Sequence, residues 1–449
     1  MCSVEEDIED ISKYSGNLRS KTLKEYRNLH KCKKCDLKSL VLLQKKDPFC
    51  KKCFFEYCSH KFRSTIGKSK KIKHADKVLL ACSGGRKSVA LLHMTKETLA
   101  FATAKQISFI PEILFIDESV ASPCIEENRN HTIHNIVKEL KSHGFPVLYS
   151  SLEMVCKISD NQDFFWNCEN FSSAEDFPAC CDSQNCLKES MAGMSLSAKL
   201  DYMKHLRLLL TTEIASQAGF NHVFVGDTSC SLAENLLNNI NLGRGSQISA
   251  DTSFCDKRYK ITVCRPLREF LNKEIAFYLH LNNCSYTVLP DLLTKTEAKS
   301  SIQRLTENFI TNLQEDFPAT VFTIFRTGGK LLKQDRVLIT ETCLLCKSKL
   351  DNIELDACSA LEALKLSEQL SKNSIPVVAE SEYILSKSND GENLEISRFL
   401  CHGCSIPFRN NKKRFQFHPI LKSVHIRMKR DEMKEEIKDF LINDDDEAS

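Results

Sequence analysis

The sequence lacks the features that define several common classes of protein. No apolar run approaches the ~18 residues that cross a bilayer, so we expect no membrane-spanning helix. The acidic start Met1–Asp7 has neither the basic nor the apolar region of a secretion signal, which favours the cytoplasm. The net charge is only +3 over 449 residues, so the chain as a whole is not a general polyanion binder. With 42% apolar and 27% charged residues, it has the composition of a globular protein of about two to four domains.

Two familiar nucleotide-binding motifs are also absent. No Gly-Lys-Ser or Gly-Lys-Thr stands at the spacing of a Walker loop, and the glycines form no dinucleotide fingerprint. The chain instead has Ser83-Gly84-Gly85-Arg86-Lys87-Ser88 between the apolar runs Val78–Ala81 and Val89–Leu92. Strand, glycine turn and helix in this order form an anion cradle, because glycine lets backbone N–H groups approach a phosphate and the helix start is partly positive. We therefore expect an anion-binding loop here; the alternative is an ordinary strand–helix connection.

Cysteine is abundant, with 22 residues. Because nothing directs the chain to an oxidising compartment, the clustering into Cys-x-x-Cys pairs favours metal binding over disulfides. Two such pairs together supply the four thiolates of a tetrahedral zinc site. We predict one structural zinc site near each end of the chain, held by Cys32, Cys35, Cys50 and Cys53 and by Cys343, Cys346, Cys401 and Cys404.

The cysteine groups differ in how strongly their spacing supports a metal. The two N-terminal pairs are close together, and the Leu- and Val-rich residues 40–43 between them could form a short hairpin. A long insert separates the two C-terminal pairs, so spacing alone does not bring them together. A third group has no regular metal spacing and is interpreted as a loop insertion, with a cluster or redox role as the alternative; it consists of Cys168, Cys180, Cys181 and Cys186.

Between the cysteine pairs, short apolar runs alternate with helical stretches, which predicts an α/β domain with a parallel sheet covered on both faces. Ligands of such sheets bind at the carboxyl ends of the strands, where the loops after Ala81, Ile116 and Val225 would meet. The expected strands are Val78–Ala81, Ile113–Ile116, Pro146–Tyr149, His222–Val225 and Ile261–Val263. The expected helices are Ser88–Thr98, Thr132–Ser142, Tyr202–Ala218, Leu232–Leu242 and Leu267–Leu281.

The loop at Ser83–Ser88 resembles the pyrophosphate loop of the PP-loop ATP pyrophosphatase superfamily, whose pattern is Ser-Gly-Gly-x-Asp-Ser. Leu114–Glu118 is similar to the strand-end acidic pair of the tRNA-thiolating branch. Gly226–Glu234 falls where catalytic members have Gly-His-Asn-Ala-Asp-Asp-x-Ala-Glu. The resemblance implies a PP-loop fold with a degenerate nucleotide site at Ser83, Gly84, Gly85, Ser88, Asp117 and Gly226.

Three positions depart from the catalytic pattern. Lys87 stands where the superfamily has an aspartate, and Cys230 and Ser231 replace two more. A lost carboxylate cannot bind magnesium or orient an attacking group, so we expect ATP to bind weakly or not at all and no residue to be catalytic. The cysteines that handle sulfur in catalytic relatives are missing from Met194–Tyr202 and Tyr286–Leu292, so no iron–sulfur cluster is expected in this chain.

Further motifs resemble one non-catalytic branch, the cytoplasmic tRNA 2-thiolation protein 2 family, over nearly the whole chain. They are Phe-Cys-x-x-Cys-Phe at Phe49–Phe54, His-Lys-Phe-Arg at His60–Arg63, Gly-Asp-x-Ser at Gly226–Ser229, Gly-Arg-Gly at Gly243–Gly245, the stretch Thr323–Gly328, and Cys-x-Gly-Cys at Cys401–Cys404. The resemblance implies a heterodimer with a catalytic PP-loop homologue. That complex makes 5-methoxycarbonylmethyl-2-thiouridine at the wobble position of tRNAs for Lys, Glu and Gln, with sulfur from a thiocarboxylated ubiquitin-related modifier. The alternatives are a self-sufficient ATP-dependent tRNA sulfurtransferase and a zinc-organised scaffold with no RNA role.

Residues His60–His74 are basic throughout and contain no acid. In a tRNA-binding surface, Lys68, Lys70, Lys71 and Lys73 would supply salt-sensitive phosphate contacts that are blind to sequence; the alternative is a solvated linker. A weaker basic element lies at Arg409–Arg414. The expected order is an N-terminal zinc knuckle module (1–60), a basic linker (61–74), the α/β domain (75–290), a helical extension (291–340), a C-terminal zinc knuckle with a mobile insert (341–410), and a helix with an acidic tail (411–449).

Overall fold

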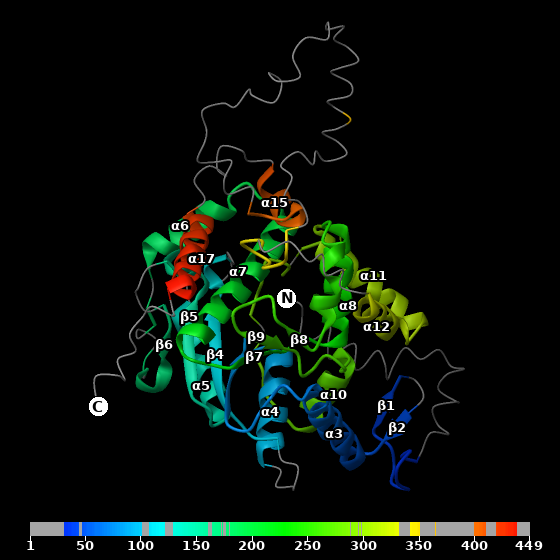
Figure 1. The fold of residues 1–449 in the computed structure, drawn as a ribbon. Coiled ribbons are helices and arrows are strands. Elements are labelled where there is room, and N and C mark those ends of the chain that lie inside the picture. The colour runs from blue at the N-terminus through cyan, green and yellow to red at the C-terminus, as the bar shows by residue number, and fades with distance from the viewer. Residues whose placement is uncertain are drawn as a thin grey trace, which may run out of the picture. The chain divides into compact units, whose positions relative to one another are not determined.

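The chain folds into two compact units, Met1–Lys333 and Gln334–Ser449, in a computed structural model (Figure 1). The structure describes residues 31–44, 47–100, 107–121, 129–159, 164–171, 173, 177–178, 180–287, 289–294, 296–297, 299–331, 342–350, 364, 399–409 and 419–437. Among these residues, none of the helices combines the length and the apolar character that crossing a bilayer requires.

The first unit is built on a seven-stranded sheet of order β6-β5-β4-β3-β7-β9-β8. Five strands run parallel: β3 (Asp76–Ala81), β4 (Phe109–Asp117), β5 (Val147–Ser151), β7 (His222–Val225) and β9 (Thr262–Cys264). Two short edge strands, β6 (Trp166–Asn167) and β8 (Cys255–Asp256), pair antiparallel and were not expected from the sequence. All five predicted strands are confirmed. The apolar runs predicted them because strands inside a parallel sheet are buried on both faces.

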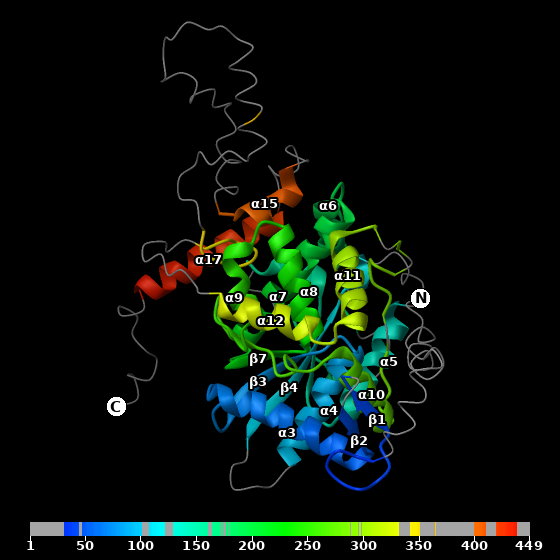
Figure 2. The same cartoon turned by 90° about the vertical axis from the view of Figure 1, so that its right-hand side faces the viewer.

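Helices cover both faces of this sheet, as predicted. Figure 2 shows α4 (Arg86–Ala100) and α5 (Arg129–Ser142) on one side of the strands and α7 (Leu196–Gln217) and α8 (Ser229–Asn241) on the other. Right-handed crossovers explain the division, since the chain moves outward from β3 to β5 in one direction and through β7 to β9 in the other. The shorter elements are η1 (Ser119–Ala121), η3 (Leu152–Lys157), η4 (Cys168–Asn170), α6 (Cys181–Met191), η6 (Gly245–Gln247) and α9 (Ile248–Thr252).

One predicted helix begins later than expected. Residues 267–281 were expected to be helical, but α10 spans only Asn272–Leu281. Leu267 and Phe270 are fully buried without being helical, so their apolar character reflects core packing and not helix periodicity. Leu271, the residue before the helix, has a satisfied backbone N–H, because Leu271 N donates to Glu274 Oε2 at 2.8 Å.

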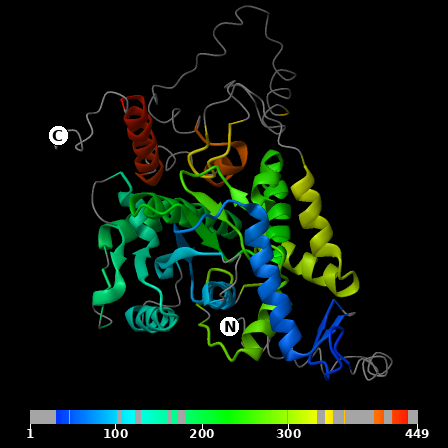
Figure 3. The same ribbon diagram turned by 60° about the horizontal axis from the view of Figure 1, so that its bottom comes forward.

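The basic linker expected at 61–74 is wrong over most of its length, because α3 runs unbroken over Lys51–Ser69. Its buried face repeats every four residues, at Phe54, Cys58, Phe62 and Ile66, none more than 2% exposed. This face joins the same apolar core as the strands of the α/β domain. The expected boundary at residue 60 therefore falls inside a helix. Figure 3 shows α3 extending from the small hairpin of β1 (Val41–Leu43) and β2 (Asp47–Phe49) along the α/β domain.

A buried ion pair fastens α3 to α10. Lys61 Nζ lies 2.8 Å from Glu274 Oε2, and the two side chains are only 16% and 2% exposed. Tyr57 Oη donates to the same carboxylate at 3.0 Å. Removing one partner of such a pair leaves an uncompensated buried charge, at a cost of about 3–5 kcal/mol. The N-terminal module is thus an integral part of the first unit.

Two helices follow the α/β domain in the region expected to be a helical extension. They are α11 (Ile302–Asp316) and α12 (Thr320–Lys330). Both helices pack on α8. At the crossing of α12 and α8, a Cβ on Gly328 would overlap Leu236 Cδ1 and lie 3.1 Å from Ile248 Cγ2 and Thr252 Cγ2 of α9, so a larger residue would require these side chains to shift.

The second unit is described at its cysteine pairs and two helices, α15 (His402–Arg409) and α17 (Pro419–Ile437). Leu344 N donates to Phe399 O at 2.9 Å, which joins the segments that carry the two cysteine pairs. The rings of Phe399 and His425 lie 4.6 Å apart, so α17 packs on the same cluster. The expected mobile insert, the acidic tail and most of the basic element at Arg409–Arg414 lie outside the described residues.

Candidate anion-binding site and metal centres

The Ser-Gly-Gly loop lies between β3 and α4, at the carboxyl edge of the sheet. Ser88 Oγ accepts from Ser83 N at 3.0 Å and lies 3.0 Å from Ser83 Oγ, which closes the loop. Gly84 has a positive φ of 78°, and a Cβ there would stand 3.0 Å from Ile136 Cγ2. Glycine is therefore required by both conformation and space. The loop has the strand–turn–helix form that was predicted.

One other expected site segment, Gly226–Glu234, meets this loop. Lys87 Nζ donates to Ser231 Oγ at 2.6 Å, although 144 residues separate them. Ser231 Oγ also lies 3.1 Å from Thr228 Oγ1, at the start of α8. Gly226, which follows β7, packs against Lys87, and a Cβ there would lie 3.4 Å from the Lys87 backbone. The structure thus brings together the positions at which this chain departs from the catalytic pattern.

Glu234 is a half-buried acid near Lys87. Burial raises the pKa of Glu234 to about 7, and the positive charge of Lys87 limits the rise. Cys230, one turn earlier on α8, is buried, and burial also raises the pKa of its thiol. The carboxylates of Glu307 and Asp227 also lie near enough to raise the pKa of Glu234. Among the described residues, no three carboxylates converge here closely enough to share a cation.

Asp117 is engaged by groups of its own chain. It is 1% exposed and accepts hydrogen bonds from Ser119 N and Ser119 Oγ, both at 2.9 Å. Arg129 Nε donates to Asp117 Oδ2 at 2.7 Å, and Arg129 Nη2 reaches Glu153 Oε1 at 3.2 Å. These bonds join the end of β4 to the start of α5. Asp117 therefore holds two elements together at the sheet edge that carries the loop.

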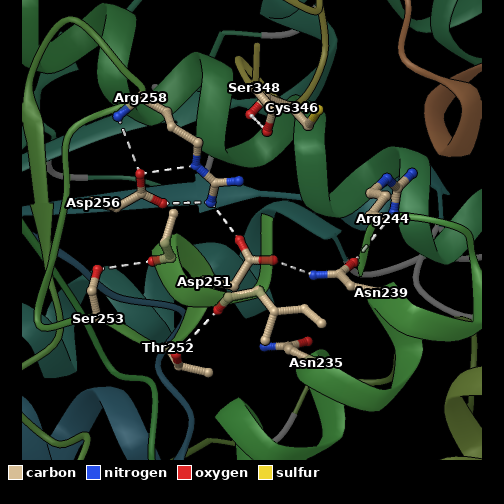
Figure 4. Close-up of polar contacts among 12 residues, drawn as sticks. Asn235, Asn239, Arg244, Asp251, Thr252, Ser253, Asp256, Arg258, Cys346 and Ser348 are labelled. Carbon is tan, nitrogen blue, oxygen red and sulfur yellow. Dashed lines mark hydrogen bonds and ion pairs between the residues drawn. The ribbon is translucent and has the colours of Figure 1, made fainter. Parts of the chain in front are cut away.

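Sequence reasoning missed a network of buried arginines beside this edge (Figure 4). Asp256 is 0% exposed, and its carboxylate lies 2.6 Å from Arg258 Nη2 and 3.2 Å from Arg265 Nη2. Burial alone would raise the pKa of Asp256, but the two guanidinium groups hold it below its ordinary value. Arg265 Nε also lies 3.3 Å from Asp227 Oδ2. A run of arginines and aspartates is a weak sequence signal, because only folding shows which of them pair.

The network explains two of the motifs noted in the sequence. Arg244, the centre of Gly-Arg-Gly, is 2% exposed and donates to Asp201 Oδ1 at 2.8 Å. Asp227, in Gly-Asp-x-Ser, receives the bond from Arg265. The first pair is buried and joins α7 to the segment after α8, so it is costly to break singly. The second pair joins the segments that follow β7 and β9, and its Asp227 side chain is 34% exposed.

The four N-terminal thiols form one group, as predicted. The Sγ atoms of Cys32, Cys35, Cys50 and Cys53 all lie within 4.8 Å of one another. Cys35 Sγ is 3.5 Å from Cys50 Sγ and 3.7 Å from Cys53 Sγ. A tetrahedral ion with metal–sulfur bonds of about 2.3 Å separates its ligands by roughly 3.8 Å, so the four thiols fit a metal of this kind. Burial raises the pKa of Cys32, but hydrogen bonds from the backbone of Cys50, Lys34 and Cys35 outweigh it and lower the value to about 6.

The C-terminal thiols form a second group of the same design. The Sγ atoms of Cys343, Cys346, Cys401 and Cys404 lie within 4.8 Å of one another, so the long insert does not keep the pairs apart. In each group, one cysteine pair lies in a loop whose ends form an antiparallel β-bridge, and the other pair lies at the start of a helix. The bridges join Lys31 to Lys38 in the first group and Thr342 to Lys349 in the second. In both loops the first cysteine N–H donates five residues ahead at 2.8 Å. Repetition of this geometry supports two metal sites.

The four lysines predicted to contact tRNA are all exposed. Lys68 lies in the last turn of α3, and Lys70 caps it in a left-handed conformation with φ of 50°. Ile72 packs against the apolar core, which fixes the segment after the helix. Within the described part of the chain, no carboxylate pairs with the ammonium groups of Lys68, Lys70, Lys71 or Lys73.

The third cysteine group does not assemble as one cluster. Cys168 is fully buried, Cys181 is exposed, and no four-thiol group forms there among the residues that the structure describes. Cys186 instead lies 3.1 Å from the Sγ of Cys156, which sequence reasoning did not single out.

Fold and sites together define an α/β protein with a Ser-Gly-Gly loop at the carboxyl edge of a parallel sheet and two four-thiol groups. The predicted fold class is confirmed. A family profile described as cytoplasmic tRNA 2-thiolation protein 2 matches residues 301–406. The protein of that name from Danio rerio is 32% identical over 505 residues, covering 99% of this chain and 100% of its own length. The one from Xenopus tropicalis is 32% identical, covering 93% of this chain and 95% of its own.

This chain belongs to the cytoplasmic tRNA 2-thiolation protein 2 family, which confirms the resemblance found in its motifs. Among solved structures, a U34-tRNA thiolase from Methanococcus maripaludis, determined with its iron–sulfur cluster, has 16% sequence identity and a TM-score of 0.49. That comparison covers 70% of this chain and 89% of the thiolase.

Proposed function

We propose that this chain is the non-catalytic subunit of the cytoplasmic complex that 2-thiolates the wobble uridine of tRNAs for Lys, Glu and Gln. It supports a catalytic PP-loop homologue, which transfers sulfur from a thiocarboxylated ubiquitin-related modifier during 5-methoxycarbonylmethyl-2-thiouridine synthesis. Membership of the family supports the role in tRNA 2-thiolation. The names of the relatives support placement in the cytoplasm.

The hydrogen bond from Lys87 Nζ to Ser231 Oγ is the observation that carries the non-catalytic assignment. The resemblance places aspartates at both of these positions in catalytic members, where carboxylates bind magnesium and orient the reacting groups. Here an ammonium group and a hydroxyl satisfy each other at 2.6 Å. A magnesium ion brought to this point would meet a positive charge instead of a negative one. The loop keeps the glycine geometry for an anion, so weak phosphate binding is compatible with the site.

The remaining features suit a subunit that organises others. Zinc is the metal that we assign to both four-thiol groups, because it favours four thiolates in closed tetrahedral sites. The lysines at 68, 70, 71 and 73 are exposed and have no carboxylate partner in the described residues, which suits phosphate contacts along the tRNA backbone. The partner supplies the chemistry, and this chain helps to hold the tRNA.

Reconstitution tests the proposal directly. The purified chain, the catalytic homologue and the two together are each incubated with ATP, the thiocarboxylated modifier and unmodified tRNA for Lys. We expect 2-thiouridine, measured by nucleoside mass spectrometry, only when both proteins are present. Calorimetry of the single chain with ATP and magnesium should show weak binding or none.

Two other results would decide for the alternatives. Formation of 2-thiouridine by the single chain would establish a self-sufficient sulfurtransferase. Full activity of the homologue by itself, with no gain in tRNA affinity when this chain is added, would show that this chain is a zinc-organised scaffold without an RNA role.

A further inference from the structure

A pair of thiols outside both four-thiol groups lies in direct contact. Cys156 is in η3, Cys186 is in α6, and their Sγ atoms are 3.1 Å apart. A disulfide bond is about 2.0 Å long, so a shift of about 1 Å would bring the two sulfurs to bonding distance. Both residues are half-buried, so neither is sealed in the core. The pair is therefore placed for oxidation.

The surroundings of the pair favour thiol–disulfide exchange. The hydrogen bond from Cys156 lowers the pKa of Cys186, which makes Cys186 the better nucleophile. A third thiol, Cys180, stands at the start of α6 and accepts a hydrogen bond from Ser183 Oγ at 3.3 Å. Cys156 Sγ also lies 3.8 Å from Ser183 O. Because Cys156 Sγ donates to Cys186 Sγ, Cys186 is favoured as the attacking thiol and Cys156 as the resolving thiol.

A metal site is the competing explanation for clustered cysteines. Among the residues that the structure describes, the only groups of three or more ligands close enough to share an ion are the two four-thiol groups. The Cys156–Cys186 pair belongs to neither group. Because no third ligand in the described part of the chain joins these two sulfurs in such a group, a redox pair fits them better than a coordination shell.

We propose that Cys156 and Cys186 form a reversible disulfide, with a small cytosolic disulfide such as glutathione disulfide as the oxidant. The Cys186 thiolate attacks one sulfur of the oxidant, and the first thiolate leaves and takes up a proton. Cys156 then gives up its proton and attacks the Cys186 sulfur of this mixed disulfide, and the second thiolate leaves and takes up a proton. Two protein thiols are oxidised to one disulfide, and one small disulfide is reduced to two thiols. The reverse reaction restores the pair.

The bond would tether α6 to the sheet edge. Gln184, on α6, donates to Glu153 Oε1 at 3.3 Å, and the same oxygen lies 3.2 Å from Arg129 Nη2. Arg129 in turn holds Asp117 at the end of β4. The disulfide would link α6 covalently to η3, beside this network. The inference rests on the geometry of the pair and does not depend on the proposed function.

A redox titration of the full chain tests the proposal. The protein is equilibrated with glutathione buffers of increasing disulfide fraction, and free thiols are alkylated before peptide mass spectrometry. We expect a cross-linked peptide containing Cys156 and Cys186, with both thiols lost in a single transition that reduction reverses. Cys181, which is exposed at the start of α6, should form only a mixed disulfide with glutathione. In Cys186→Ser the cross-link should vanish, whereas the control Cys181→Ser should retain it.

The wild-type measurement decides the matter even if a variant fails to fold. The proposal is overturned if Cys156 and Cys186 stay alkylatable while Cys181 becomes glutathionylated. It is equally overturned if the oxidised product links either thiol to Cys180 instead, or if the pair releases a bound metal when it is oxidised.

Discussion

Lys87 and Ser231 are hydrogen-bonded across 2.6 Å, and they join the loop after β3 to the start of α8. The resemblance implies a carboxylate at each of these positions in catalytic relatives. Here an ammonium group and a hydroxyl form a closed polar contact at the edge of the sheet.

The first prediction concerns Glu234, the half-buried acid near Lys87. Its pKa is raised by burial from 4.5 to about 7 in the folded protein. The folded state therefore keeps a proton that the unfolded state releases, and the free energy of unfolding should fall as pH rises from 4.5 to about 7. Glu234→Gln should flatten this fall. Urea unfolding across the window measures the effect, with the exposed Glu56→Gln as control. An unchanged pH profile in Glu234→Gln would contradict the raised pKa.

The second prediction concerns the N-terminal four-thiol group. We expect the folded chain to contain two equivalents of zinc, one for each of its two groups. Cys35→Ser should remove one equivalent, measured by metal analysis. Because α3 shares its core with the sheet, thermal unfolding of the whole first unit should shift to lower temperature. Cys181→Ser, an exposed control, should change neither quantity. Folded wild-type protein without zinc would disprove the assignment.

The third prediction concerns tRNA binding by the complex. Replacing Lys68, Lys70, Lys71 and Lys73 with Glu should weaken tRNA binding and flatten its dependence on salt, because fewer counterions are released. The same charge change at four other exposed lysines is the matched control: Lys96, Lys138, Lys299 and Lys330. Binding isotherms at several salt concentrations give both affinity and slope. Equal losses in the two variants would show that net charge alone, and not this surface, governs binding.

The fourth prediction compares two adjacent glycines of α12. Gly328→Ala would push a methyl group into Leu236 of α8, and such overpacking should destabilise the protein by about 1–3 kcal/mol. A Cβ on Gly329 would meet only Thr252 Oγ1, at 3.8 Å. Gly329→Ala should therefore be neutral or stabilise by up to about 1 kcal/mol, since alanine favours helix. Chemical denaturation of both variants measures the difference. Equal stability would contradict the expected overlap and show that the Leu236 side chain moves aside at little cost.

Much of the fold could be predicted because its signals are local. Short apolar runs such as Val78–Ala81 mark the buried parallel strands, and every predicted strand formed. The apolar repeat of Phe54, Phe62 and Ile66 also predicts a helix. The basic residues around it favoured a solvated linker instead, and that prediction was wrong. At residues 267–271 the opposite error arose, because apolar residues that pack as a buried turn resemble the start of a helix.

The sequence by itself determined the parallel α/β architecture, the Ser-Gly-Gly loop and the membership of both four-thiol groups. Each depends on residues close together along the chain, or on pairs whose chemistry requires a partner pair. Only the tertiary structure decided three contacts: the hydrogen bond from Lys87 to Ser231, the hydrogen bond from Arg129 to Asp117, and the contact between the sulfurs of Cys156 and Cys186. These contacts join residues 144, 12 and 30 positions apart. Their partners are chosen by the packing of whole helices on the sheet, and no periodicity in the sequence records that choice.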